Sequence, residues 1–268
     1  MNRTVVVGVD GSARSRVAMD WAAQEARRRG LPLRPAHIVA TDGPPDTGRV
    51  VPQLMARYDV PVEGTLCSGG IVPRLLDLGA NAELVVVGMR GAGGHAGLRV
   101  GSVALGVASR SPVPVALVPF LPSSGELRRR ADKVTVGLDA REPAEAALDF
   151  ALDAACRRTA RLHALHIWSY PPSPLASLPF AVPEKDRATW EDQEVQLLSD
   201  VLRPWREKYP DARVLPDVFL SRIASDALVR ASASAAVIVV GRRHEGRLGR
   251  TVLSLLQHSR CPVVVVPS

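Results

Sequence analysis

Short apolar runs alternate along this chain with longer segments in which apolar and polar residues are mixed. In the first part of the chain the apolar runs lie at residues 4–9, 33–39, 60–66 (the weakest), 84–88 and 115–118. Runs that are apolar at nearly every position are typical of parallel strands whose two faces are both covered. None of them approaches the roughly 20 apolar residues that a membrane-spanning helix needs. The pattern therefore predicts a buried parallel sheet and no membrane partner.

The mixed segments carry the start and stop signals of helices. Ser12 is a candidate N-cap for a helix that continues to Arg29 and is stopped by Gly30. Further helices are expected at residues 51–58, 71–82 and 102–109. Strands joined by crossover helices predict an α/β fold class, in which each unit is a doubly wound, five-stranded parallel sheet with the strand order 3-2-1-4-5.

The whole pattern occurs twice along the chain. The segments that recur are 5–10 as 134–139, 36–38 as 165–167, 84–88 as 237–241 and 114–119 as 262–267. A repeat of this length is a complete domain, because each copy holds enough apolar residues to bury its own core. We expect a first domain over 1–120, a linker over 121–131 and a second domain over 132–268. In the second copy a long helix over 184–208 replaces a short one, and residues 169–183 form an insertion.

Composition limits the classes of partner. The net charge of +7 suits nucleic acid, but only 4% of the residues are aromatic, too few for a base-stacking surface. We therefore expect no nucleic-acid partner. Cys67, Cys156 and Cys261 form no C-x-x-C pair, so neither a metal site nor a disulfide framework is indicated. The first residues lead directly into a strand rather than into a signal peptide, and we expect a cytoplasmic protein.

Two strands of the first copy end in residues that suit a bound phosphate. The first strand runs into Asp10, Gly11 and Ser12, and the fourth runs through Gly88 into a glycine-rich loop before a helix. Ligands of doubly wound sheets lie beyond the carboxyl ends of such strands. Glycine lets the backbone approach a ligand closely, and the N–H groups at a helix N-terminus attract phosphate. On its own, Asp10 is equally well explained as a cap of the following helix or turn.

The spacing of Gly88, Gly91, Gly101 and Ser102 resembles the G-x2-G-x9-G-[ST] nucleotide loop of the universal stress protein family. The likeness covers essentially the whole chain as a tandem pair. It implies that ATP is the cofactor, with Mg²⁺ carried by its phosphates, and that the closing strands of the two halves pair antiparallel in an intramolecular pseudo-dimer. A further homodimer stays open. The resemblance, with the neighbouring residues, gives these expected nucleotide-binding positions: Asp10, Gly11, Ser12, Ile38, Gly88, Arg90, Gly91, Gly101, Ser102 and Val103.

The second copy departs from this motif. It keeps Asp139, Ile167, Gly241 and Gly249, but His244 stands where the first copy has Gly91, and Arg250 stands where it has Ser102. Both replacements add bulk to a shorter loop. We therefore expect only the first half to bind ATP and the second half to carry a degenerate phosphate loop. The alternative is that the arginines of this loop, Arg242, Arg243, Arg247 and Arg250, hold a different anion.

The expected function is that of an ATP-binding stress adaptor, with no catalytic residue and at most slow ATP hydrolysis. No G-x4-G-K-[ST] sequence is present, which excludes a P-loop ATPase. His37 and His166 recur at one position, and we expect them to be packed rather than catalytic. Two alternatives remain. One is a slow Mg-dependent ATPase that uses Asp10, and the other is a nucleotide-free interaction module whose arginine-rich second half binds an acidic partner.

Overall fold

The computed structural model describes residues 3–39, 65–90, 100–120, 132–170 and 184–268. The strands in this part of the chain form one sheet in the order β3-β2-β1-β4-β5-β10-β9-β6-β7-β8. Each half thus contributes strands in the predicted order 3-2-1-4-5, and the expected α/β class is confirmed. The predicted helix at 51–58, the linker at 121–131 and most of the predicted insertion lie outside the described residues.

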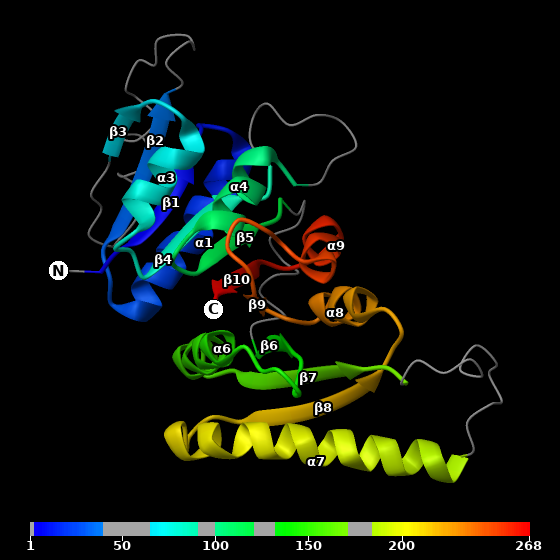
Figure 1. The fold of residues 1–268 in the computed structure, drawn as a ribbon. Helices are drawn as coiled ribbons and strands as arrows, with labels where there is room; N and C mark the ends of the chain where they lie inside the picture. The colour runs from blue at the N-terminus through cyan, green and yellow to red at the C-terminus, as the bar shows by residue number, and fades with distance from the viewer. Residues whose placement is uncertain (1–2, 40–64, 91–99, 121–131, 171–183) are drawn as a thin grey trace.

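All strand pairs within a half are parallel, and the two halves meet along an antiparallel seam (Figure 1). At this seam β5 pairs with β10, and Val264 lies opposite Ala116. The pairing of the closing strands expected from the resemblance is therefore confirmed. The strands are β1 Val5–Val9, β2 Leu33–Val39, β3 Thr65–Ser68, β4 Leu84–Gly88, β5 Val115–Val118, β6 Lys133–Leu138, β7 Arg161–Trp168, β8 Val214–Leu220, β9 Val237–Arg242 and β10 Val263–Pro267.

Helices cover both faces of the sheet. Helices α1, α6 and α7 pack on one face, and α3, α4, α8 and α9 pack on the other. Their bounds are α1 Ala13–Arg29, α3 Ile71–Gly79, α4 Ser102–Arg110, α6 Glu145–Arg157, α7 Glu184–Lys208, α8 Ala224–Ser232 and α9 Arg250–His258. In the described part of the chain no helix is both long and apolar enough to cross a membrane.

The ends of α1 follow from local chemistry. The Ser12 side chain accepts a hydrogen bond from the Ser15 N–H at 3.1 Å, which satisfies one of the first free donors of the helix. Gly30 ends the helix in the left-handed region at φ 63°, where a side chain would be strained. Both predicted signals are confirmed.

The two halves share their hydrophobic interior. One cluster of buried side chains contains Val7 of the first half together with Val136 of the second, and a second cluster on the opposite face contains Val6 together with Ile238. Because each cluster runs across the seam, unfolding of one half exposes apolar surface of the other. We therefore expect the chain to unfold as one unit.

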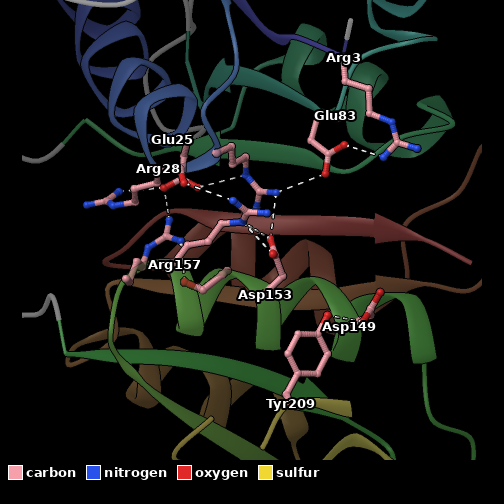
Figure 2. A network of polar contacts seen from close by, with 11 residues as sticks. Arg3, Glu25, Arg28, Glu83, Asp149, Asp153, Arg157 and Tyr209 are labelled. Atoms are coloured by element: carbon pink, nitrogen blue, oxygen red, sulfur yellow. Dashed lines mark hydrogen bonds and ion pairs between the residues drawn. The ribbon is translucent and has the colours of Figure 1, made fainter. Parts of the chain in front are cut away.

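A network of charged side chains lies where α1 and α6 end next to each other (Figure 2). The buried carboxylate of Glu25 accepts hydrogen bonds from Arg28 and from Arg158 of the other half. Arg29 is buried as well and lies 3.2 Å from Asp153 and 3.4 Å from Glu83. The C-termini of two helices, each with a partial negative charge, thus lie close together, and the positive charge of the arginines offsets their repulsion.

Candidate functional site

The carboxyl ends of β1, β2 and β4 surround a small cavity of about 110 Å³ in the first half. Five of the expected nucleotide-binding residues line it, namely Asp10, Ile38, Gly88, Arg90 and Val103. The rest of its lining is Gly8, Val9, Ser15, Ala36, Ile71, Leu75 and Val87. The cavity therefore joins a carboxylate and a guanidinium to an apolar floor. Gly91 lies outside the described residues.

Two of the expected residues take part in the start of α1 instead of lining this cavity. The Ser12 N–H donates to Asp10 Oδ1 at 3.0 Å, so Asp10 caps the turn before α1, while Ser12 caps the helix itself. Gly11 adopts φ 77°, which a side chain would disfavour, and lets the chain turn between strand and helix. Gly11 and Ser12 thus shape the turn that presents Asp10 to the cavity. Sequence reasoning missed Ser15, which lines the cavity, although its position three residues after the N-cap was a usable signal.

The helix α4 begins next to this cavity. Its N-cap, Gly101, has no side chain to satisfy the first N–H groups of the helix. The Gly101 N–H itself donates to the Met89 oxygen at 2.7 Å, so it is engaged within the protein. The N–H groups of Ser102 and Val103 lie in the first turn, where a helix offers no internal acceptor. These groups, with Arg90, suit an anion, and the donor set fits the phosphates of a nucleotide.

Gly88 is required by the packing of the backbone. A Cβ atom at this position would lie 3.3 Å from the Arg90 oxygen and 3.6 Å from the Arg14 oxygen. The first distance is tighter than most real contacts, and a carbonyl oxygen of the main chain gives way less easily than a side-chain end. Glycine at the end of β4 therefore allows the turn after this strand to come close to the start of α1.

The second half contains a larger cavity at the equivalent strand ends, of about 590 Å³. Its lining includes the four residues that the second copy retains from the motif, Asp139, Ile167, Gly241 and Gly249. The shorter loop does not close the site, and the space that it leaves exceeds that enclosed by the described residues of the first half.

The side chain of Arg242, the last residue of β9, reaches into the first half. Its guanidinium is buried and donates to the carbonyl oxygens of Ala108 and Ser111, at 3.0 and 2.9 Å, at the C-terminal end of α4. The Gly246 N–H donates to the Ser109 oxygen nearby at 2.7 Å. Burial lowers the pKa of Arg242. The alternative that Arg242 holds an anion is therefore wrong; it holds α4. No local pattern could reveal this contact, because its partners lie in the other copy.

The two recurring histidines are hydrogen-bonded within the fold, as expected. His37 Nδ1 lies 2.8 Å from the Val9 oxygen. His166 is buried, accepts from the Ala140 N–H at Nδ1, and lies 2.9 Å from Glu194 through Nε2. In the described part of the chain, no cluster of His, Cys, Asp and Glu could hold a metal ion.

Comparison with known proteins agrees with this architecture. The model of the universal stress protein family matches residues 1–60, 57–119 and 131–267. Among its relatives, the universal stress protein Rv2623 of Mycobacterium tuberculosis is 31% identical, over 97% of this chain and 95% of its own length. Rv2005c of the same organism is 32% identical over 97% and 96%. The crystal structure of a universal stress protein from Archaeoglobus fulgidus covers 98% of both chains with a TM-score of 0.67 at 18% identity, a likeness of fold. The chain belongs to the universal stress protein family, as a tandem pair of its units.

Proposed function

We propose that the first half of the chain binds ATP and that the protein is a nucleotide-responsive stress adaptor with at most slow hydrolysis. The observation that carries this proposal is the convergence of Asp10, Ile38, Gly88, Arg90 and Val103 on one cavity at the carboxyl ends of β1 and β4. These residues come from four separate parts of the first half, namely the ends of β1, β2 and β4 and the first turn of α4, and they meet next to the open N-terminus of α4.

Each group has a role that its chemistry supports. The apolar floor at Ile38 suits the base, and the Asp10 carboxylate is an acceptor for ribose hydroxyl groups. Arg90 and the N–H groups of the first turn of α4 suit the phosphates. Bound Mg²⁺ would be carried by the phosphates and would neutralise part of their charge. None of these residues is placed as a general base, which is why hydrolysis is proposed to be slow.

Helix α4 supplies a route by which a bound nucleotide could be sensed. Its N-terminus faces the proposed phosphate position, while its C-terminal carbonyl groups are held by Arg242 of the second half. A shift of this helix on nucleotide binding would therefore move the carbonyl groups that Arg242 contacts, and with them the loop of the second half. The adaptor role rests on this connection.

Titration calorimetry with MgATP tests the proposal on nucleotide-free protein and on Gly101→Arg. The matched control is Gly249→Arg, at the equivalent helix start of the second half. A Cβ at Gly101 would make ordinary contacts and one at Gly249 none, so neither backbone position excludes a side chain, and circular dichroism checks that both variants are folded. We expect one equivalent of ATP per chain, lost in Gly101→Arg and kept in Gly249→Arg. No binding by the wild type, two equivalents, or loss in the control alone would each contradict the proposal.

The alternative of a nucleotide-free module with an acidic partner is less well supported. Several arginines of the second half are already paired with acids of the same half. Examples are Arg141 with Glu194 and Arg157 with Asp153. Salt-sensitive capture of an acidic protein, without any ATP binding, would favour this alternative.

A further inference from the structure

The cavity of the second half has the size of a ligand site. Its volume of about 590 Å³ lies within the range of about 300–1,000 Å³ that is usual for small-molecule pockets. It opens at the carboxyl ends of β6 and β9, where the strand order reverses and ligands of doubly wound sheets bind. Its floor is formed by apolar side chains, among them Leu138, Ile167, Leu228, Val240 and Leu248.

The rim of this cavity is cationic. Arg247 and Arg250 line it and are exposed, and neither forms an ion pair with any described residue. The N-terminus of α9 opens at the same rim, because its N-cap Gly249 provides no capping side chain. A Cβ at Gly249 would meet nothing within 4 Å, so the approach to the helix end is open. Two guanidinium groups without an ion-pair partner in the described part of the chain, and a positive dipole end, thus lie around an apolar floor.

The carboxylate that corresponds to Asp10 is paired with an arginine of its own half. Asp139 is the counterpart of Asp10, but it lies 3.1 Å from the Arg243 guanidinium, which also lies 3.0 Å from Glu142. The chain also turns sharply between His244 and Arg247, which form an isolated antiparallel bridge where the first copy has its longer glycine-rich loop. The site therefore lacks the long phosphate loop, while it keeps the apolar floor and gains positive charge.

We propose that the second half binds an amphipathic organic anion, an apolar body that carries a single carboxylate or phosphate group. The apolar body occupies the floor between Leu228 and Val240. The anionic group lies at the rim between Arg247, Arg250 and the first N–H groups of α9. This ligand differs from the nucleotide proposed for the first half, and the inference goes beyond that proposal, because the two sites are formed by different residues.

The test uses the fluorescent anion anilinonaphthalene sulfonate with the full chain. We expect saturable binding at one site, and binding weakened roughly tenfold or more by the double substitution Arg247→Glu and Arg250→Glu. Ala224→Trp, which fills the cavity from the start of α8, should weaken binding as well. Arg222→Glu is the matched control, since Arg222 is exposed in the same half and does not line the cavity. Circular dichroism confirms that each variant is folded.

Competition then identifies the chemistry of the ligand. Octanoate or octyl phosphate should displace the probe, and the stronger of the two shows whether a carboxylate or a phosphate is preferred. Octanol, with the same chain and no charge, should displace it poorly. The proposal is wrong if octanol competes as well as the anions, if charge reversal at the rim has no effect, or if the probe does not bind. Loss of the probe in Gly101→Arg, with binding kept in the rim variant, would place it in the first half and also overturn the proposal. The ATP titration is independent of all these results.

Discussion

Glu25 is the residue whose replacement should reveal how strongly α1 is bound to α6. Its side chain is 1% exposed, and its carboxylate is the main anionic partner of Arg158, which is 6% exposed. Burial lowers the pKa of Arg158, while the Glu25 charge raises it, so the carboxylate is what keeps this guanidinium favourable in the interior. Glu25→Gln keeps the shape of the side chain and removes its charge.

We expect this substitution to lower the free energy of unfolding by about 3–5 kcal/mol. This is the typical cost of removing one member of a buried ion pair, because the other charge then stays buried without its partner. For a chain of this size the melting temperature should fall by roughly 6–20 °C. The measurement is urea unfolding, in which the midpoint should decrease while the slope is unchanged. Replacing both partners, Glu25→Leu with Arg158→Leu, should recover much of the loss, since no charge then remains buried alone.

The matched control is Arg3→Ala. Arg3 pairs with Glu83 at 2.8 Å, so the two groups are in direct contact, but the Arg3 side chain is 73% exposed. We expect a cost below about 1 kcal/mol, because water screens such a pair. A Glu25→Gln variant that is no less stable than Arg3→Ala would refute the reasoning, since it would mean that water reaches the network. Two separate unfolding transitions would contradict the expectation of a single unit.

Two further predictions concern the second half. Arg242→Ala removes two hydrogen bonds from a charged donor, each worth about 1.5–3 kcal/mol. Hydrogen exchange should therefore accelerate more at the C-terminal end of α4 than at α3. Equal acceleration in both helices would contradict the role of Arg242 in holding α4. Burial raises the pKa of Glu194, but hydrogen bonds from Arg141 and His166 outweigh it, and the net pKa is lowered. The unfolded chain therefore takes up the proton first as the pH falls, and the stabilisation present above the ordinary carboxylate pKa of about 4.3 is lost through the lower, folded value. Unfolding free energies from pH 7 to 3 should fall more steeply for the wild type than for Glu194→Gln, and equal slopes would contradict this.

Local patterns predicted most of the fold. The bounds of β2, β4, β5 and α7 agree with the apolar runs and helical segments, because each element is determined by residues close to it in the chain. The strand order 3-2-1-4-5 was expected because it is one of the orders that doubly wound sheets adopt, and the structure confirms it. The prediction of β3 was the least accurate: the weak apolar run at 60–66 overlaps the observed strand Thr65–Ser68 only at its first two residues, because a short strand at the edge of a sheet leaves a weak pattern. The predicted domain boundaries stay predictions, as the linker is not among the described residues.

The site was predicted less completely, for two physical reasons. First, a single residue can serve two structures: Asp10 lines the cavity and also accepts from Ser12 in the turn before α1. Second, contacts between the halves join residues far apart in sequence. In the sequence, Arg242 is indistinguishable from the three neighbouring arginines, and only the fold shows that it contacts α4. The open cavity of the second half was likewise hidden, because bulky residues in a loop do not reveal in which direction they point.

The antiparallel seam between β5 and β10 has a consequence for the ratio in which the two proposed sites occur. Only three residue pairs form its register, from Val263 opposite Leu117 to Val265 opposite Val115. If the two halves were separate chains, their association would depend on protein concentration, and each half would also meet copies of its own kind. Because both halves belong to one polypeptide, their effective concentration is set by the connecting segment and not by the number of molecules in the cell. Each molecule therefore carries the two proposed sites in a fixed ratio of one to one at any protein concentration.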